Sequence, residues 1–569
     1  MGGTSNQRLL GLCAGFLALL GVLWIRCVWL QVLQSARLAK LAAVQHHVSR
    51  PLPAQRGTIY DRTGRALAMS VRMPSVFANP RQMDDKADVA VQLASVLGGG
   101  QQLMAQRLDR NKGFVWLARQ VDPDLKEELL PLRREGIGLV EESKRVYPNG
   151  TMAAHLLGDV DIDEKGLEGL ELGFNGLLQG SAGWLSTIRD AKGDLLIGPW
   201  STQIESQAGL ELVLTIDGVV QSVAEEALAW GVEKFHAKGG SLIVMDPHSG
   251  AILALANQPS FDPNHPGRAK PDARRNRAIT DLAEPGSVFK VVTASALLEE
   301  HLARLDERVF CEQGSYHTVG HHVLHDHTSH GSLSFQDVIT YSSNIGTAKL
   351  AQRLTPETLY RYIRLFGFGQ KTGIEAPGEV SGIVPPPAKW SKLSPFIIPI
   401  GQEVAVTPMQ LAVMLSAIAN GGWKVQPHLI ARIQDVGGQL VRASRAHAPQ
   451  RILSLETADQ VQTMLTSVVE SGTGQLAKVQ GLTVAGKTGT AQKLEPAGHY
   501  SHSRFVASFV GYGPVPDPRF VMVVTVDEPH PQYFGGSVSA PIFRRVVEQL
   551  VSYWELKPPV TPGAIATLP

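Results

Sequence analysis

The chain has 569 residues, more than a typical single domain holds, so two or more domains are expected. Its 53 basic and 52 acidic residues give a formal net charge of +1, and no basic block of the kind that follows a phosphate backbone is present, which argues against a nucleic-acid partner. Cys13 and Cys27 lie in or beside an N-terminal apolar run, so Cys311 stands alone and no disulfide framework is expected.

The N-terminal apolar run, Leu9 to Ile25, has seventeen residues without a charge. This length is at the lower edge of what spans a bilayer, and Arg26 can extend its charge to the interface. A cleaved signal peptide is the alternative, but no clear small-x-small cleavage site follows the run. We expect an uncleaved transmembrane anchor at residues 9–30 after a cytoplasmic N-terminus at residues 1–8. The count of basic residues on the two sides leaves the orientation open.

Two further domains are expected after the anchor. Residues 31–208 contain short strand-like runs, many charges and glycine-rich turns, which indicate a mixed domain. From Gly209 to Phe235 the pattern changes to a strand and then a helix, for which Asp217 is a plausible N-cap. We therefore expect a second domain at residues 209–556, followed by a proline-containing disordered tail at residues 557–569.

The second domain contains five β-rich runs with helical segments between them. The runs are Ser241 to Met245, Ala251 to Ala256, Leu482 to Gln492, Phe505 to Tyr512 and Phe520 to Val526. The turn "DPHSG" joins the first pair and "GPVPDP" the last pair, so each pair is predicted to form a hairpin. The helical segments include Val291 to Glu300, Phe335 to Leu354 and Pro408 to Ala419. The expected fold class is α+β, with helices flanking a five-stranded antiparallel sheet.

The segment "LAEPGSVFKVVTASALLEE" places Ser287 and Lys290 three residues apart in an otherwise apolar helix that is expected to begin at the serine. A serine hydroxyl is a weak nucleophile and needs a base at hydrogen-bond distance. A lysine at i+3 on a helix is a near neighbour, and burial by the apolar flank favours the neutral amine that a base requires. The pair alone is a weak signal, because chance often produces S-x-x-K.

Two further motifs follow in the chain and support this pair. "YSSNIG" contributes Ser342 and Asn344, and "GKTGT", on a predicted strand, contributes Lys487, Thr488, Gly489 and Thr490. S-x-x-K, S-D-N and K-T-G form a set already described for serine β-lactamases and penicillin-binding proteins. All three elements in that order predict acyl transfer through a serine, without a cofactor.

Sequence blocks across about residues 40–545 resemble the class B penicillin-binding proteins, membrane-anchored transpeptidases that cross-link bacterial peptidoglycan. They include "RGTIYDRTGRALA", "GLEGLELGFNGLLQG", "LTIDGVVQ" and "GQEVAVTPMQLA". "YSSNIG", with Asn344 in third place, is most similar to the division-specific, FtsI-type subgroup, often called penicillin-binding protein 3. The resemblance implies that residues 31–208 form an elongated pedestal (dimerisation-type) domain and residues 209–556 the transpeptidase domain.

The resemblance also implies catalytic roles. Ser287 would attack the carbonyl of the penultimate D-alanine while Lys290 accepts its proton. Ser342 and Lys487 would relay a proton to the leaving amine. Asn344 would hold the amide of the donor peptide and help orient Lys290.

Substrate binding would fall to the third motif. Thr488, Gly489 and Thr490 would bind the donor, with the two threonine hydroxyls on its terminal carboxylate. The backbone N–H groups of Ser287 and Thr490 would form the oxyanion hole.

The resemblance places the protein in the bacterial cytoplasmic (inner) membrane, with the catalytic domain outside. It implies septal cell-wall synthesis on peptidoglycan stem peptides of lipid-linked nascent glycan, and β-lactams as inhibitors. An FtsW-type glycan polymerase and other divisome membrane proteins are the expected partners. The alternatives are an elongation-specific transpeptidase, a D,D-carboxypeptidase or β-lactamase-like hydrolase, and a silent scaffold or β-lactam sensor.

Six histidines are concentrated between Ser315 and Ser332, namely His317, His321, His322, His325, His327 and His330. Such density is compatible with a metal site, but the spacing matches no strong zinc pattern. Part of this segment, Asp326 to Ser334, resembles the family's approach to the second motif. We expect a solvated loop and no metal.

Overall fold

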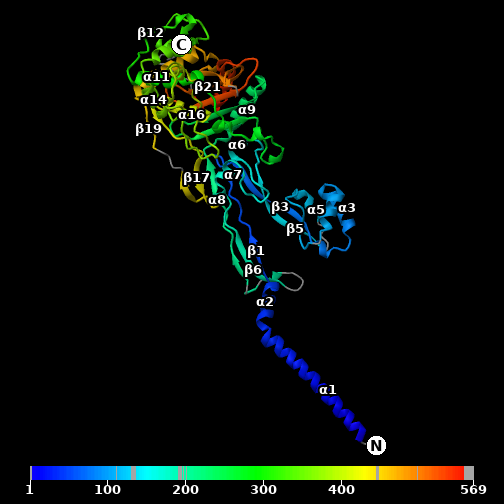
Figure 1. Ribbon diagram of the computed structural model, residues 1–569. Coiled ribbons are helices and arrows are strands. Elements are labelled where there is room, and N and C mark those ends of the chain that lie inside the picture. The colour runs from blue at the N-terminus through cyan, green and yellow to red at the C-terminus, as the bar shows by residue number, and fades with distance from the viewer. Residues whose placement is uncertain are drawn as a thin grey trace, which may run out of the picture. The chain divides into compact units, whose positions relative to one another are not determined.

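The computed structural model describes residues 3–110, 112–129, 136–189, 195–196, 198–199, 201–443, 448–495 and 498–556. The tail predicted at residues 557–569 lies outside them. The chain forms two compact units, one of Met1–Gln55 with Gly180–Gly209 and the other of Arg56–Gln179 with Leu210–Pro569 (Figure 1). The domain bounds given above stay predictions.

The first unit begins with the long helix α1 (Gly3–Val28), which a π-helical turn at Trp29–Leu33 extends. Within Asn6–Leu33, an 18-residue stretch has a mean hydropathy of 2.1, and the segment is long and apolar enough to cross a membrane. Helix α2 (Ser35–His46) follows. The unit also has a four-stranded sheet of β1 (His47–Leu52), β6 (Gly183–Arg189), β7 (Leu195–Leu196) and β8 (Thr202–Ile204).

The second unit contains a seven-stranded sheet of order β18-β17-β9-β2-β3-β4, with β5 also paired to β3. Its strands are β2 (Ile59–Tyr60), β3 (Ala66–Ala78), β4 (Val115–Ala118), β5 (Ile137–Val146), β9 (Glu211–Leu214), β17 (Ile430–Gln434) and β18 (Leu440–Ala443). Helices α3 (Lys86–Leu97) and α4 (Gln101–Leu108) form a small core with β3 and β4.

A buried ion-pair network lies beside this sheet. Glu171, which is fully buried, accepts hydrogen bonds from Arg56 Nε at 2.8 Å and from Arg145 Nε at 2.7 Å. Arg145 also donates to the Gly57 carbonyl at 2.9 Å. The network joins the segment before β2, the end of β5 and helix α7 (Gly169–Gly173), so ion pairs as well as apolar packing hold these three pieces of chain together.

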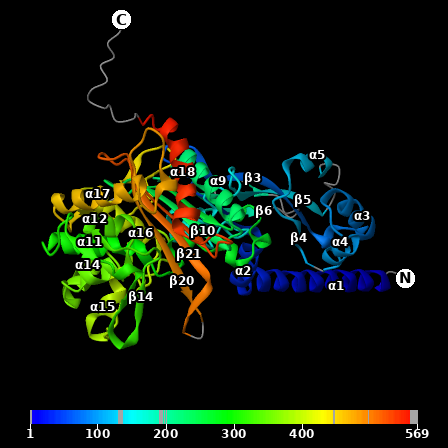
Figure 2. The same ribbon diagram turned by 90° about the horizontal axis from the view of Figure 1, so that it is seen from above.

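The predicted five-stranded antiparallel sheet is confirmed, with the order β11-β10-β22-β21-β20. The strands are β10 (Gly239–Met245), β11 (Ile252–Gln258), β20 (Ala485–Leu494), β21 (Tyr500–Gly513) and β22 (Phe520–Asp527). Figure 2 shows α9 (Gly218–Lys234) and α18 (Gly535–Tyr553) on one face, with α11 (Lys290–Glu299), α16 (Pro408–Ala419) and α17 (Leu455–Glu470) on the other. The sheet is therefore buried on both sides.

The helix predicted from Phe335 to Leu354 is wrong in one respect. The structure has two helices, α12 (Phe335–Thr340) and α13 (Asn344–Ala351). The chain breaks at Ser342, whose φ is +62°. A left-handed residue cannot continue a right-handed helix, so the second motif forms a turn between two helices.

The remaining elements are short. The helices are α5 (Lys126–Leu129), α6 (Ala154–Leu157), α8 (Asn175–Leu178), α10 (Arg277–Thr280), α14 (Pro356–Leu365) and α15 (Ser394–Ile397). The strands are β12 (Arg308–Phe310), β13 (Ser315–His317), β14 (Val323–His325), β15 (Ser332–Ser334), β16 (Trp423–Lys424) and β19 (Gln450–Arg451).

Candidate active site

Ser287 lies in a 3₁₀ turn, Gly286–Phe289, which we call the nucleophile turn. The expectation that the α-helix begins at the serine is therefore wrong, because α11 begins at Lys290. Gly286 has φ +52°, and a Cβ there would lie 2.8 Å from the Thr490 carbonyl oxygen. Because Gly286 has no side chain, the backbone of the turn can approach strand β20 closely. Ser287 is half-buried in this turn.

Lys290 is fully buried, and its amine contacts the second motif. Its Nζ donates to the Ser342 carbonyl at 2.6 Å and to Ser342 Oγ at 3.2 Å. Burial lowers the pKa of Lys290 to about 7, against the opposing effect of Asp326 and of Cys311. An amine with this pKa is partly neutral at physiological pH and can accept a proton.

Lys487 reaches the same hydroxyl from the opposite side. Its Nζ donates to Ser342 Oγ at 2.9 Å and to the Thr488 carbonyl at 3.3 Å. Burial, together with the charge of Lys290, holds the pKa of Lys487 well below its ordinary value. Because Ser342 Oγ accepts from both amines, one hydroxyl connects two bases.

In the part of the chain that the structure describes, no hydrogen bond joins the Ser287 hydroxyl to Lys290, whose amine bonds to Ser342. Hydrogen bonds of catalytic groups are often long in unliganded enzymes and shorten when substrate binds.

Asn344 is the first residue of α13. Its Nδ2 donates to the His325 carbonyl at 2.8 Å, and its backbone N–H donates to Asp326 Oδ1 at 2.5 Å. The amide oxygen of Asn344 stays available to accept from a ligand. The structure thus brings Lys290, Ser342 and Lys487 together and holds Asn344 against the loop that follows β14.

Strand β20 distributes the third motif over its two faces, because successive side chains alternate. Lys487 and Gly489 face the helices that carry the first two motifs, whereas Thr488 and Thr490 face the start of α18. Thr490 Oγ1 accepts from the Gly535 backbone N–H at 3.0 Å, so its own proton is free to be donated.

Thr473 is a neighbour of the site that the sequence motifs did not indicate. Its Oγ1 lies 2.7 Å from Thr488 Oγ1 and forms a hydrogen bond with it. Thr473 follows the end of α17, fifteen positions before its partner. A local pattern gives no signal for a contact of this kind.

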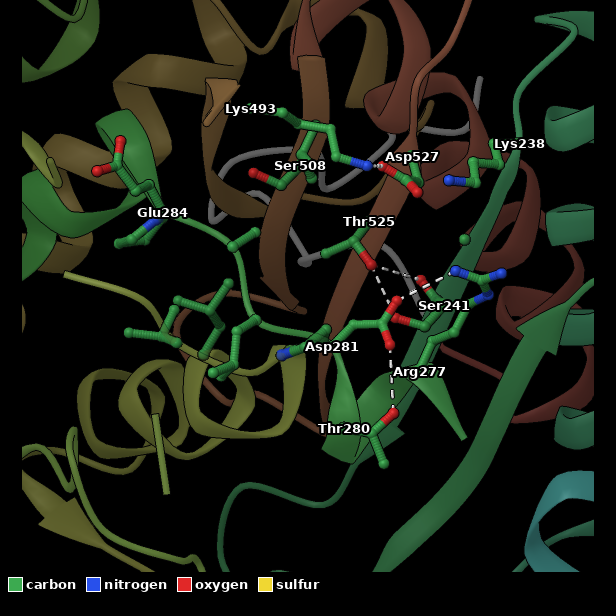
Figure 3. Close-up of a pocket in the computed structure, with 18 of the residues that line it drawn as sticks. Lys238, Ser241, Arg277, Thr280, Asp281, Glu284, Lys493, Ser508, Thr525 and Asp527 are labelled. Atoms are coloured by element: carbon green, nitrogen blue, oxygen red, sulfur yellow. Dashed lines mark hydrogen bonds and ion pairs between the residues drawn. The ribbon is translucent and has the colours of Figure 1, made fainter. Parts of the chain in front are cut away.

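A cavity of about 380 Å³ is lined in part by Glu284 and Pro285, which precede the nucleophile turn (Figure 3). A row of hydroxyls from three neighbouring strands, Ser508, Thr525 and Ser241, lines it, and the Ser241 and Thr525 oxygens are 2.7 Å apart. Arg277 lies beside Ser241 and donates to Asp281 Oδ2 at 3.1 Å (Figure 3). None of the described residues that line this cavity belongs to the three motifs.

The histidine-rich segment forms the hairpin of β13 and β14 and the loop after it. His327 packs edge-on against Phe534 at 4.5 Å between ring centroids, and His330 stacks on Tyr341 at 5.5 Å. Among the described residues, no three His, Cys, Asp or Glu side chains are grouped to hold a metal ion. The expectation that the site needs no metal stays a prediction.

Comparison with known proteins identifies two family domains. Residues 51–214 match the family described as "Penicillin-binding Protein dimerisation domain", and residues 240–548 match "Penicillin binding protein transpeptidase domain".

Individual relatives extend over nearly the whole chain. The chain is 33% identical to the peptidoglycan D,D-transpeptidase FtsI of Escherichia coli K12, over 96% of this chain and 92% of that protein. It is also 33% identical to the stage V sporulation protein D of Bacillus subtilis 168, over 98% and 87%. The crystal structure of penicillin-binding protein 3 from Mycobacterium tuberculosis, complexed with aztreonam, matches with a TM-score of 0.70 and 29% identity, over 89% of this chain and 98% of that one.

Proposed function

Because this chain belongs to the class B penicillin-binding proteins, we propose that its three motifs act as a serine acyl-transfer site and serve septal cell-wall synthesis. The protein is a serine-type peptidoglycan D,D-transpeptidase and a β-lactam target. Its N-terminal apolar helix anchors it in the cytoplasmic membrane, and the catalytic domain lies outside. The convergence of two buried amines on Ser342 Oγ is the observation that best supports the proposed roles.

In the first half-reaction, Ser287 Oγ forms a bond to the carbonyl carbon of the penultimate D-alanine, and its proton passes to Lys290. The bond from that carbon to the nitrogen of the terminal D-alanine then breaks. Lys487 and Ser342 deliver a proton to this nitrogen, so D-alanine leaves as a neutral amine. Because Ser342 Oγ contacts both lysines, the proton taken from Ser287 has a direct route to the leaving group.

In the second half-reaction, an amine of a neighbouring stem peptide attacks the acyl-enzyme. The new amide bond forms as the ester bond to Ser287 breaks; the attacking nitrogen gives its proton to Ser342 and Lys487, and Lys290 returns a proton to the serine oxygen. The backbone N–H groups of Ser287 and Thr490 donate to the oxyanion in both half-reactions.

The third motif binds the donor's terminal carboxylate through the hydroxyls of Thr488 and Thr490. Thr490 can donate because its oxygen already accepts from Gly535. Gly489 keeps the strand close to the nucleophile turn. Asn344 holds the donor's amide through its side-chain oxygen, since its Nδ2 is occupied by His325.

A fluorescent penicillin tests these roles, because its strained amide acylates the nucleophile and its leaving group stays attached. We expect a long-lived adduct on the tryptic peptide that contains Ser287. Ser287→Ala should abolish it, and Lys290→Arg should nearly do so, because a guanidinium cannot act as a base. Ser295→Ala is the matched control, since Ser295 is buried on α11, the helix that carries Lys290, and donates to the Val291 carbonyl. An adduct on another serine, or full labelling of Lys290→Arg, would falsify the assignment.

The septal role has support from "YSSNIG" and "GQEVAVTPMQLA", which resemble the division-specific subgroup. We infer that an FtsW-type glycan polymerase and other divisome membrane proteins are its partners. Depletion of the protein in its own host should then give filaments with incomplete septa. Loss of rod shape with normal septa would instead favour the elongation-specific role.

A further inference from the structure

Ser342 holds the two lysines together from a backbone conformation that an L-residue rarely adopts. Its φ of +62° lies in the left-handed region, and it is one position before the N-cap of α13. Such a conformation costs of order 1 kcal/mol or more and persists only where surrounding contacts fix it. The contacts that fix Ser342 therefore determine where its hydroxyl lies relative to both amines.

The Ser342 N–H donates to the Ile339 carbonyl at 3.2 Å, and Asp326 holds the three residues that follow Ser342 from outside the helix. Its Oδ1 accepts from the backbone N–H groups of Asn344 at 2.5 Å and Ile345 at 3.0 Å, and its Oδ2 accepts from Ser343 Oγ at 2.6 Å. Ser343 Oγ in turn accepts from the Gly346 N–H at 2.9 Å. One carboxylate thus satisfies N–H groups that the first turn of α13 leaves unpaired, and its charge favours that end of the helix.

The loop that carries Asp326 is itself fixed to the second motif. The preceding carbonyl, of His325, accepts from Asn344 Nδ2, and the Asp326 N–H donates to the Gly314 carbonyl at 3.2 Å. Asp326 is half-buried, so its negative charge is only partly screened by solvent.

The titratable groups that act on Lys290 come from three elements. They are Lys487 on β20, Asp326 after β14, and Cys311 before the 3₁₀ turn Glu312–Gly314. Burial lowers the pKa of Lys290, and Asp326 provides the larger of the two opposing effects. Among the described residues it is the carboxylate that acts on this amine.

We propose that Asp326 is a positioning residue of the transpeptidase reaction, which fixes the Ser342 turn between the two lysines and supplies the negative charge that the general base experiences. This inference rests on the proposed function, in which neutral Lys290 accepts the proton of Ser287. That role sets how removal of the Asp326 charge should change the pH dependence of acylation. The negative charge favours the protonated amine, so loss of the charge lets Lys290 become neutral at lower pH.

The test is the pH dependence of acylation of the full chain in detergent by a fluorescent penicillin, measured as a second-order rate constant between pH 5 and 9. Asp326→Asn keeps the size of the side chain and removes its charge. We expect its maximal rate to fall about tenfold, because hydrogen bonds to the Ser342 turn are weakened. We also expect the acid limb of the profile, where the rate constant falls as pH is lowered, to move to lower pH by about one unit. Asp326→Glu keeps the charge and should leave the limb near that of the unaltered protein, although its rate is lower.

Asp337→Asn is the matched control. Asp337 is also half-buried in the first turn of a helix, α12, and accepts from the Ser334 hydroxyl at 2.7 Å. Its substitution should leave the limb in place. Thermal unfolding of each variant separates loss of fold from loss of rate.

An Asp326→Asn limb at the same pH as in the unaltered protein, or an equal shift in Asp337→Asn, would overturn the proposal even if rates fall. Failure of the proposed function gives a different result, because the unaltered protein itself would then carry no adduct on Ser287.

Discussion

Burial of two amines beside one hydroxyl places the site's chemistry in conflict with its stability. Lys290 and Lys487 are both fully enclosed, and neither has a carboxylate as a hydrogen-bond partner among the described residues. An amine in such surroundings loses its proton more readily, which is what a base at neutral pH requires. The same burial makes the folded state less favourable than it would be with an apolar side chain there.

Lys290→Met should therefore stabilise the protein while abolishing acylation. The pKa of Lys290 is about 7 when folded and near its ordinary value of 10.5 when unfolded. Between these values the unfolded chain binds more protons, so the stability of the unaltered protein rises with pH, by at most about 1.4 kcal/mol per pH unit from this group. We expect Lys290→Met to have the higher Tm at pH 7 and the gap to narrow towards pH 10. A gap that widens with pH would contradict this reasoning; differential scanning calorimetry at several pH values measures it.

Thr473→Val should slow acylation about fivefold and destabilise the fold by about 1 kcal/mol. The change keeps the shape of the side chain but removes the hydrogen bond to Thr488, a loss of about 1 kcal/mol. Thr466→Val is the control, since Thr466 donates to the Gln462 carbonyl within α17 and, among the described residues, has no hydrogen bond to the motif. Equal rates for both variants would show that the contact with Thr488 has no part in binding the carboxylate.

The residue types of the site were predictable because each motif is short and contiguous. The burial of Lys290 also followed from its apolar neighbours. Thr473 and Asp326 were not assigned roles, because their contacts join positions fifteen and up to nineteen residues apart and depend on the fold. Asn344 was assigned a role from its motif, but the bond from its Nδ2 to the His325 carbonyl also depends on the fold.

Close packing between β20 and the nucleophile turn sets the geometry of the site at the level of elements. A Cβ at Gly489 would press against Ser508 Oγ and would lie 2.8 Å from Val288 Cγ2 and 3.0 Å from the Pro285 carbonyl. The hydroxyl of Ser508 can rotate, but the Pro285 carbonyl cannot move without the turn that carries Ser287. The close spacing between β20 and the nucleophile turn is therefore possible only because Gly489 has no side chain.

Gly489→Ala should displace the nucleophile turn. We expect a destabilisation of about 1–3 kcal/mol from overpacking and a fall in acylation of roughly a hundredfold, because small displacements of reacting groups are costly. Gly176→Ala is the control, since a Cβ at Gly176 meets no atom within 4 Å. Chemical denaturation and penicillin labelling of both variants measure the two effects, and normal labelling of Gly489→Ala would show that the turn tolerates the shift.

Strands β10, β11 and β22 of the catalytic sheet were predictable because they carry dense runs of apolar and β-branched residues bounded by turns, whereas β20 contains two glycines and few apolar residues. The break between α12 and α13 was missed, although Ser342, Ser343 and Asn344 favour helix caps over helix interiors and Ser343 is the N-cap of α13. The positive φ of Ser342 has no local signal, because it depends on tertiary contacts such as the bonds of Asp326 to the start of α13.

At the scale of the whole molecule, pairing between distant segments could not be predicted from the sequence. Strand β9 pairs in parallel with β2, which is about 150 residues away, and antiparallel with β17, which is over 200 residues away. Arg56, Arg145 and Glu171 likewise meet from separate segments. Each of these strands is short, so periodicity alone gives no indication of its partner.

The exposed apolar side chains of the N-terminal helix bear on assembly with other membrane proteins. The described side chains of α1 between Leu9 and Ile25 are mostly exposed and apolar, for example Phe16 at 65% and Trp24 at 71%. In a bilayer these surfaces contact lipid or another membrane helix, and packing between helices there depends on the fit of side chains. We therefore expect the anchor to contribute specific contacts to an FtsW-type polymerase as well as membrane attachment.

Co-purification from detergent tests this expectation with three forms of the protein: the full chain, a form without residues 1–30, and a form in which residues 9–30 are replaced by an unrelated apolar span of equal length. The replaced form is the matched control, because it keeps membrane attachment and loses only the side-chain pattern. We expect the full chain to recover the polymerase, the replaced form to recover much less, and all folded forms to be labelled by penicillin. Equal recovery by the full and replaced forms would show that the anchor provides membrane attachment alone. The polymerase contacts would then have to come from the domains outside the membrane.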